Sequence, residues 1–452
     1  MHPSRDFDAP DFGDIEFRQL YERALERSAQ LRARRTRRRA AAATAALACL
    51  LVVGLVAGSF AAVTAGRQPV ASSWRLVSDV SAASSSWQAL SPSGYEQAGL
   101  FSLVCPSDTT CYADSVGGQL EYTHDGGATW QQTTVSGTAM SLPQISCVDA
   151  QNCDVLADIT GRGSTFLTTT DGGRTWTSRP GPAIPPNTAQ NHLAVMSCAT
   201  ISSCVVIAYN GNSVGSSSAV FTTSDRGASW TQRTLGSPAS REFVPSGLNC
   251  SGTTCVAVGA IGIWQSGPGP GGSAWFSFRR RGKAAYTSGD GGATWSASSA
   301  PPGYIPSLTC PDATDCYAAD FFAVYHSKDG GQTWGQVSTS GLPGPLSPSS
   351  GWSFSAVSCA SSSSCWLAGA ANPPASSHTN TIVIGQAEGL LASTADGGST
   401  WTLSTLPAGV GGVVDVTCPG TTTCFALGVE QTAHNGSKVV LLTNTHKRGR
   451  AV

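Results

Sequence analysis

The sequence predicts an all-β fold, a seven-bladed β-propeller with four strands in each blade, preceded by a cytoplasmic helix and one transmembrane helix. Two repeats and one apolar segment lead to this prediction. A pattern with Asp-Gly at its centre and Trp at its end returns six times, and a closely spaced pair of cysteines returns seven times. The apolar segment, residues 40–66, precedes all of them.

The Asp-Gly patterns are typical of β-hairpin turns. Each stands between two apolar or Thr-rich runs, as in THDGGATW at residues 123–130. Glycine allows positive φ, the Asp carboxylate accepts backbone N–H groups across a turn, and Trp has a large apolar face to bury. We therefore expect a structural role for the Asp and Trp of each copy: Asp125, Trp130, Asp171, Trp176, Asp225, Trp230, Asp290, Trp295, Asp329, Trp334, Asp396 and Trp401.

The cysteine pairs predict seven local disulfides in an exported domain, because the alternative leaves fourteen thiols unexplained. A zinc site is disfavoured, since no His accompanies any pair at ligand spacing. We predict no metal and no cofactor. Cys49 lies within the apolar segment and needs no partner. The pairs are Cys105 with Cys111, Cys147 with Cys153, Cys198 with Cys204, Cys250 with Cys255, Cys310 with Cys316, Cys359 with Cys365, and Cys418 with Cys424.

The repeat period fits propeller blades. Dividing residues 85–446 by seven gives roughly fifty residues in each unit. Within one unit, the runs 142–147, 153–158 and 164–170, and a fourth run that begins at Trp176, alternate with short turns. Four strands in each unit make one blade.

The motif S/T-x-D-x-G-x-T-W resembles the Asp box, also called the bacterial neuraminidase repeat. Five copies match closely, and the sixth has Ser229 for Thr and Arg226-Gly227 for Gly-Gly. Similar motifs occur in the propellers of sialidases, sortilin-type receptors, xyloglucanases and a photosystem II assembly factor. These proteins do unrelated things, so the resemblance implies architecture and little about function.

The first 84 residues predict a membrane anchor. Residues 1–39 form a cytoplasmic segment with an amphipathic helix that either extends the membrane span or docks a partner or lipid headgroups. Residues 40–66 carry no charge and are long enough to cross a bilayer, and an arginine cluster precedes them, so the chain after Gly66 is expected outside. A cleaved signal peptide is the alternative. Residues 67–84 are expected to form a stalk, although 74–77 has the composition of a short strand.

The way the ring closes is predicted from an unpaired outer strand near the start of the repeats and a missing outer strand in the last repeat. Residues 87–92, which begin with Trp87, look like a fourth strand without a preceding Asp-Gly turn. The C-terminal repeat stops after its third strand, at 438–444, and 447–452 is expected to be a disordered tail. We therefore expect 87–92 to supply the outer strand of the last blade, within a propeller that spans 85–446.

A ligand is expected either on the face opposite the cysteine loops and Asp-Gly turns or in the central channel. The connection at 260–285 is long and mixes aromatic with basic side chains, which suits sugar rings, an anionic polymer or an acidic partner. The alternative is a solvated hairpin without a ligand. The candidate ligand-face residues in this connection are Trp264, Trp275, Arg279, Arg280, Arg281 and Lys283.

The charge composition disfavours one class of function, nucleic-acid binding. A net charge of −1 with 12% charged residues does not suit a nucleic-acid binder. We predict a single-pass membrane protein whose extracytoplasmic propeller is a binding or assembly module for a cell-envelope protein or glycan.

The alternative function is a sialidase-like glycoside hydrolase. The resemblance to sialidases implies three arginines, a Tyr with a Glu partner and an acidic Asp. The sequence lacks the F/Y-R-I-P segment of that family, whose propellers have six blades. Candidate residues for this alternative are Arg162, Arg241, one of Arg279 to Arg281, Glu242 and, as a pair of carboxylates, two of Asp114, Asp158 and Asp320.

Overall fold

A computed structural model of the chain describes residues 74–79, 102–115, 119–133, 140–159, 163–184, 192–212, 215–236, 243–268, 274–343, 352–371, 388–431 and 437–444. The chain divides into two units between Pro69 and Val70, and all described residues belong to the second. The predicted cytoplasmic helix, membrane span and C-terminal tail lie outside these residues. Among the described residues, no helix is long and apolar enough to cross a membrane.

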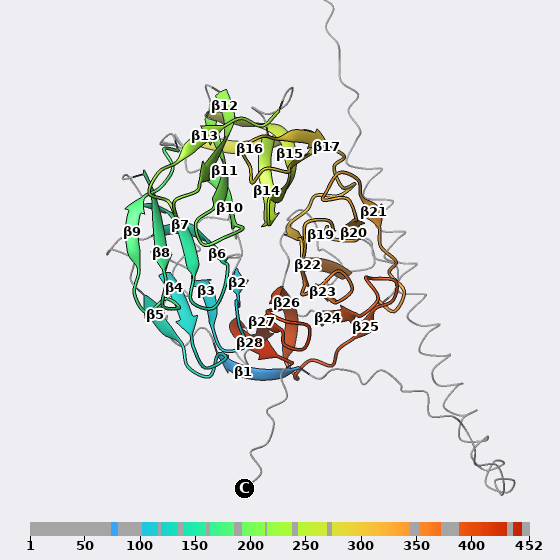
Figure 1. Cartoon of the computed structure of the whole chain (residues 1–452). Helices are drawn as coiled ribbons and strands as arrows, with labels where there is room; N and C mark the ends of the chain where they lie inside the picture. Colours follow the sequence, from blue (N-terminus) through green and yellow to red (C-terminus); the bar gives the residue numbers. More distant parts are fainter. Residues whose placement is uncertain are drawn as a thin grey trace, which may run out of the picture. The chain divides into compact units, whose positions relative to one another are not determined.

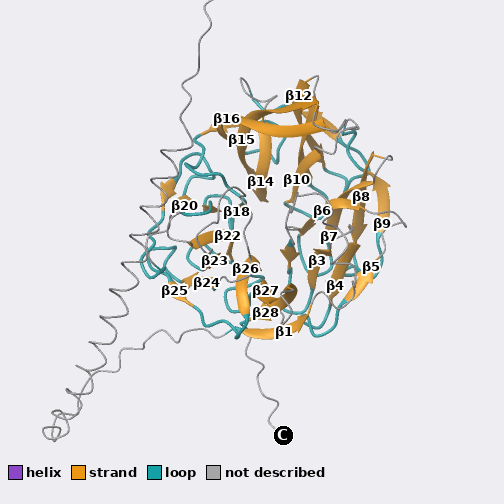
Figure 2. Cartoon of the chain, turned by 180° about the vertical axis from the view of Figure 1, so that it is seen from behind, coloured by secondary structure: helices purple, strands orange, loops and turns teal. Residues whose placement is uncertain are grey.

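The described unit is a seven-bladed β-propeller, as the repeats predict. Seven antiparallel sheets of four strands each surround a common centre (Figure 1). The first strand of blades one to six is the inner one, and the fourth lies at the rim. The same arrangement is seen from behind in Figure 2.

The first four blades follow the chain in order. Blade one is β2 (Leu103–Val104), β3 (Cys111–Ser115), β4 (Gln119–Thr123) and β5 (Gln131–Thr133); blade two is β6 (Met140–Cys147), β7 (Cys153–Ile159), β8 (Gly163–Thr169) and β9 (Thr177–Pro180); blade three is β10 (His192–Cys198), β11 (Cys204–Asn212), β12 (Gly215–Thr223) and β13 (Thr231–Arg233); blade four is β14 (Phe243–Ser251), β15 (Thr254–Pro268), β16 (Ala274–Ser288) and β17 (Ser296–Ser298).

The last three blades complete the ring. Blade five is β18 (Ser307–Thr309), β19 (Cys316–Ala319), β20 (Val324–Ser327) and β21 (Gly335–Gln336); blade six is β22 (Trp352–Cys359), β23 (Cys365–Ala371), β24 (Gly389–Thr394) and β25 (Thr402–Leu403); blade seven is β26 (Val410–Thr417), β27 (Phe425–Gln431), β28 (Ser437–Thr443) and, from the other end of the chain, β1 (Arg75–Asp79).

The ring closes through β1, which pairs antiparallel with β28 from Arg75 opposite Thr443 to Asp79 opposite Val440. The expected division, one strand from the N-terminal side and three from the C-terminal side, is therefore correct. The expected strand was wrong. Residues 75–79 occupy the outer position that we assigned to 87–92, so the propeller begins before residue 85 and part of the expected stalk belongs to it. Residues 87–92 lie outside the described part of the chain.

Trp74, directly before β1, explains why residues 75–79 form the outer strand of blade seven. Its indole is buried in the cluster between blades six and seven and meets Trp366 edge to face, with ring centroids 5.2 Å apart. Its backbone N–H donates to the carbonyl of Thr405 in blade six. β1 is thus held both by its pairing with β28 and by a buried aromatic anchor.

Hydroxyl groups link the inner strands of successive blades. The residue before the first cysteine of a blade accepts the backbone N–H of the first cysteine in the next blade. Four such bonds are present: Cys198 to Ser146, 2.9 Å; Cys250 to Ser197, 3.0 Å; Cys418 to Ser358, 3.1 Å; and, across the closure, Cys105 to Thr417, 3.5 Å. The signal in the sequence is a Ser or Thr directly before the cysteine, and the sequence analysis overlooked it.

The six Asp-Gly turns share one hydrogen-bond pattern. In blade one, Asp125 Oδ1 accepts from the Thr123 hydroxyl and the Thr129 N–H, both at 2.8 Å, and Oδ2 accepts from the Thr129 hydroxyl at 2.6 Å. The turns at Asp171, Asp225, Asp290, Asp329 and Asp396 repeat these bonds. The side-chain and backbone donors of Thr175 lower the pKa of Asp171 to about 2, so its carboxylate stays ionised.

Each Asp-Gly turn also binds the cysteine loop of its own blade. The N–H that follows the Asp donates to a carbonyl in that loop, as from Gly126 to Thr109 at 2.9 Å. The other five bonds are Gly172 to Gln151, Arg226 to Ser202, Gly291 to Thr253, Gly330 to Thr314 and Gly397 to Ser363. The turns and the cysteine loops therefore occupy the same face, as expected.

The second glycine of the turn fits against the preceding blade. Gly173 has a φ of 88°, and a Cβ there would lie 2.8 Å from the Tyr112 ring in blade one. A side chain at this position is therefore excluded by both backbone conformation and space.

All seven predicted disulfides are present, each closing the loop between the first two strands of its blade. The loops are short, so each disulfide restricts the unfolded chain by at most about 3 kcal/mol. Seven clusters of buried residues fill the seams between neighbouring blades in the described unit.

Glu121 is an exception in these seams. It pairs with Ala113 and so shares its face of the sheet, which packs against Phe425, Leu427 and Leu441 of blade seven. Its exposed fraction is 2%, and Oε2 has no hydrogen-bond partner within the described part of the chain. The corresponding positions of blades two to six are apolar or aromatic: Leu167, Phe221, Tyr286, Tyr325 and Ala392.

We expect Trp74→Ala in the full-length protein to lower the free energy of unfolding by about 3–5 kcal/mol, because it removes the buried anchor of β1. Leu76→Ala on the same strand is the control, since Leu76 is exposed. Denaturant unfolding with the disulfides intact measures both. Equal stability of the two variants would show that β1 does not hold the ring closed.

A second prediction concerns Glu121, whose pKa burial raises to about 7 from 4.5. A pKa raised by folding gives stability that is full below the unfolded value and declines as the pH rises through the folded value. Relative to wild type, Glu121→Gln should gain about 3 kcal/mol between pH values of about 4.5 and 7. Unfolding at a series of pH values measures this gain, with Glu388→Gln at an exposed glutamate as control. A pH-independent difference would contradict it.

Candidate functional site

The two faces of the propeller differ in what occupies them. The turn face carries the disulfide loops and the Asp-Gly turns, whose polar groups bond to one another. The opposite face carries the connections between second and third strands and the links between blades. Because loops on a rigid scaffold supply most binding residues, the opposite face is the better place for a ligand.

In the described part of the chain, blade four carries a long hairpin arm on this opposite face. β14 pairs with β15 only as far as Ile261, whereas β15 and β16 stay paired with each other to Pro268 and Ala274. The arm beyond the blade has two segments, 262–268 and 274–280, and is about 20 Å long at about 3.3 Å per residue. A β-bulge marks its base, and Arg281 is the extra residue of this bulge.

The six predicted ligand-face residues all belong to this hairpin. Trp264, opposite Phe278, and Trp275, opposite Gly267, lie in the arm. Their side chains and that of Arg279 lie outside the description. The side chains of Arg280, Arg281 and Lys283 are exposed near the base of the arm. The structure places Arg280 against Tyr304, a residue of the link between blades four and five.

Arg280 belongs to a cluster of aromatic residues between blades four and five. Its guanidinium carbon lies 4.7 Å from the centre of the Tyr304 ring, in the geometry of a cation–π contact. Tyr304 stacks on Phe321 with centroids 6.2 Å apart and planes at 19°, and Phe322 follows at 6.3 Å. We call Arg280, Tyr304, Phe321 and Phe322 the platform.

The platform is partly open to solvent. Tyr304 is 38% exposed and Phe321 is 36% exposed, which is unusual among the aromatic side chains that the structure describes. Tyr304 lies in the link from β17 to β18, and the two phenylalanines lie between β19 and β20. Sequence reasoning missed the aromatic members because it looked for them only within the long blade-four connection.

The loop that carries Phe321 is held by a carboxylate. Asp320 Oδ1 accepts the N–H groups of Phe322 and Ala323 at 2.7 and 2.6 Å, and Oδ2 accepts the Tyr325 hydroxyl at 3.0 Å. Burial, with the Asp320 charge as a further cause, raises the pKa of Tyr325 to about 12, so Tyr325 remains a donor. Gly303 packs directly against Asp320, where a Cβ would clash with the carboxylate.

The platform is also connected to blade six and bordered by a cation. The carbonyl of Phe321 accepts the N–H of Phe354 in β22 at 2.8 Å. Lys283 lies on the same side of β16 as Ala285, which packs in the seam between blades four and five. Two blades and the link between them thus hold a preorganised aromatic surface with basic groups at one edge.

The carboxylates of the hydrolase alternative are not brought together in the described residues. Asp320 is engaged in the bonds just described. Asp114 and Asp158 lie at the ends of β3 and β7, and their side chains lie outside the description, as do Arg162, Arg241 and Glu242.

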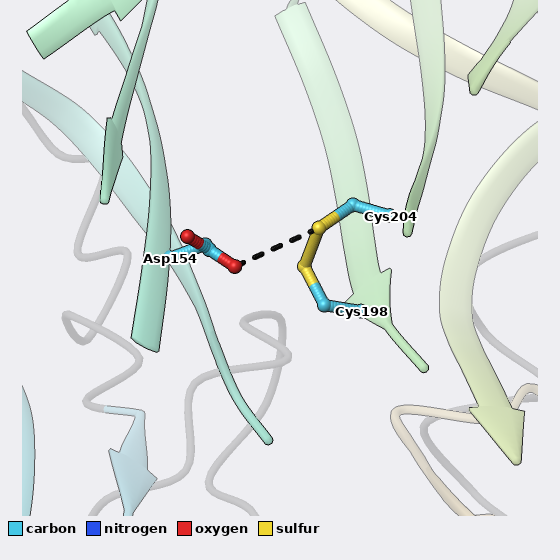
Figure 3. A group of neighbouring side chains, drawn as sticks. All are labelled: Asp154, Cys198 and Cys204. Atoms are coloured by element: carbon cyan, nitrogen blue, oxygen red, sulfur yellow. Dashed lines mark hydrogen bonds between the residues drawn. A yellow bond between two sulfur atoms is a disulfide. The ribbon is translucent and has the colours of Figure 1, made fainter. Parts of the chain in front are cut away.

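One buried group combines residue types that bind metals, namely Asp154, Cys198 and Cys204 (Figure 3). The two cysteines form a disulfide, so they offer no thiolate. Asp154 Oδ2 lies 3.7 Å from the Cys204 sulfur, but a disulfide sulfur has no proton to donate. The residues therefore do not fit a metal ion.

Arg226 is the partner of Asp154 instead. Its Nε lies 3.6 Å from Asp154 Oδ1, and its other nitrogens donate to the carbonyl of Thr169 at 2.5 Å and to Asn152 Oδ1 at 3.3 Å. Arg226 stands where five turns have glycine, with a φ of 57°. Burial raises the pKa of Asp154 to about 6, and Arg226 opposes this rise.

This unusual turn residue therefore joins two blades. The backbone of Arg226 belongs to blade three, whereas every one of its side-chain partners belongs to blade two. A left-handed conformation costs a residue other than glycine about 1–2 kcal/mol. We infer that the contacts with blade two offset this cost.

Comparisons with known proteins find similarity at the level of fold. No protein-family model and no curated protein matches the sequence. Similar solved structures include YCF48 bound to D1 peptide, with 18% identity, a TM-score of 0.46 and coverage of 76% of this chain and 93% of that one. YCF48 from Cyanidioschyzon merolae has 15% identity, a TM-score of 0.46 and coverage of 82% and 98%.

A third similar structure is the GH74 xyloglucanase from Xanthomonas campestris, with 14% identity, a TM-score of 0.28 and coverage of 76% of this chain and 56% of that one. Identities and TM-scores this low carry no argument about function.

We expect Arg226→Met to lower the free energy of unfolding by about 3–5 kcal/mol at pH 8, because it leaves the Asp154 carboxylate buried and unpaired. In an Asp154→Asn background the same change should cost much less. Denaturant unfolding of the four proteins gives the coupling between the two residues. Arg174→Met, at an exposed turn arginine, is the control. An equal cost in both backgrounds would mean that the ion pair is not what holds the two blades together.

Proposed function

We propose that the chain is a single-pass membrane protein of the Asp-box, or bacterial neuraminidase repeat, family, with its N-terminus in the cytoplasm and its propeller outside. In this proposal the propeller is a binding or assembly module for a cell-envelope protein or glycan. The anchor proposal is supported by the uncharged segment 40–66 and by the arginines that precede it. It is also supported by the seven disulfides, which suit an oxidising compartment.

The observation that carries the binding proposal is the platform. Two stacked aromatic rings remain more than a third exposed, although most large apolar side chains of the described strands are buried. Arg and Tyr are enriched among the residues that dominate binding energies. The loop beneath Phe321 is fixed by Asp320, so little conformational freedom is lost when a ligand binds. A surface that is exposed, aromatic and preorganised is typical of a binding site.

The glycoside hydrolase alternative has less support. That chemistry needs two carboxyl groups placed on either side of a glycosidic bond. Asp320 is the one candidate whose side chain is described, and its oxygens already accept two backbone N–H groups and a Tyr hydroxyl. A binding module without hydrolysis is therefore the proposal that we favour.

Capture from a cell-envelope extract tests the binding proposal. The tagged full-length protein should retain an envelope protein or wall polymer, and an Arg280→Gln/Phe321→Ala double variant should retain at least about tenfold less, the loss that corresponds to about 1.4 kcal/mol. Arg174→Gln and Ile201→Ala, two exposed positions on the turn face, are the matched controls. Equal retention by the double variant would place the binding site elsewhere. Release of sugar from the extract would favour the hydrolase instead.

A further inference from the structure

The chemistry of the platform defines the ligand more closely than the proposed function on which this inference rests. The guanidinium carbon of Arg280 lies 4.7 Å from the centre of the Tyr304 ring, and the Arg280 side chain is exposed. The cation–π contact holds the guanidinium beside the ring, and its N–H donors form a planar fork. A planar fork held in this way is suited to bidentate bonds with a carboxylate or phosphate.

Charge complementarity also favours an anionic ligand. Arg280 and Lys283 are exposed at the base of the arm, beside the platform. The Asp320 carboxylate next to Phe321 accepts hydrogen bonds within its own loop. The basic groups therefore give this edge of the face a positive potential, which attracts acidic ligands and repels cationic ones.

The aromatic part requires a second feature in the same ligand. Phe321 is 36% exposed beside the stacked Tyr304 ring, so the ligand needs a flat apolar surface close to its negative charge. Acidic sugars have both features in one rigid unit, because the carboxylate is attached to a pyranose ring whose C–H groups form an apolar face. The Tyr304 and Phe321 rings offer flat apolar surfaces to such a unit, with their centroids 6.2 Å apart.

An acidic polypeptide matches the platform less well. Its carboxylates lie on flexible side chains, and its apolar groups belong to other residues. Bringing both onto a rigid surface therefore loses conformational entropy for each side chain that becomes ordered. A rigid ring with an attached carboxylate avoids most of this loss.

We propose that the platform binds an acidic polysaccharide of the cell envelope, with the Arg280 guanidinium on a sugar carboxylate and the exposed part of Phe321 against the C–H face of a pyranose ring. Lys283 extends the contact to a neighbouring acidic unit along the polymer. The ligand lies across the seam between blades four and five.

Binding of defined polymers to the full-length protein in detergent tests this assignment. The probes are oligogalacturonate, the neutral galactose oligomer of equal length, and oligoglutamate. We expect oligogalacturonate to bind at low salt, the neutral oligomer to bind at least tenfold more weakly, and oligoglutamate likewise. Phe321→Ala and Arg280→Gln should each weaken oligogalacturonate binding at least tenfold, and Arg280→Lys should restore only part of it because it lacks the planar fork. Thermal melting confirms that each variant is folded, and Phe321→Leu replaces any variant that is not.

The outcomes separate this inference from the proposed function. Equal binding of oligoglutamate and oligogalacturonate, or binding that Phe321→Ala leaves unchanged, would mean that charge alone is recognised and would overturn the assignment. Envelope capture that depends on the platform, together with no affinity for oligogalacturonate, would overturn the polysaccharide assignment and leave the binding module in place. Capture that no platform variant affects would overturn the proposed site itself.

Discussion

The structure depends on closing a ring whose blades bury their apolar faces only against one another. All seven clusters of buried residues in the described strands lie between blades, so an open seam would expose apolar surface in blades seven and one together. Closure uses three contacts at different radii: the hydroxyl of Thr417 bonds to blade one near the centre, apolar residues fill the seam, and β1 completes blade seven at the rim. The local turns and disulfides shape single blades and leave this requirement untouched.

Two carboxyl groups buried in the described seams are accommodated differently, one by an ion pair and the other by a raised pKa. Asp154 has an arginine from the neighbouring blade, obtained by placing Arg226 at a turn position that normally requires glycine. Glu121 has apolar neighbours across the closing seam, and its burial favours the neutral form. A carboxyl group in these seams is therefore either ionised and paired with a cation, or protonated and neutral. The seam that closes the ring is the one whose stability depends on pH through Glu121.

The period of the cysteine pairs and Asp-Gly turns was sufficient to predict the seven blades, because each repeat encodes a local hairpin with its own turn chemistry. Closure was predicted in principle and misplaced in detail, since Trp87 follows the pattern of the fourth strands, whereas the burial of Trp74 against Trp366 is a contact between distant segments. Of the platform residues, the sequence predicted Arg280 as a ligand-binding residue but not the aromatic members, again because these meet it through contacts between distant segments. Arg280 stands in a conspicuous insertion, but Tyr304 and Phe321 join it only through the packing of two blades.

The position of β1 in the chain has a consequence for biogenesis. β1 is made first and its partner β28 last, so at about 5–20 residues per second the strand waits on the order of half a minute for its pairing edge. Each disulfide joins cysteines only five or six positions apart and can form as soon as its own loop emerges. Maturation is thus divided in time: blades can be fixed one after another in the order of synthesis, while the ring remains open until the final strand arrives.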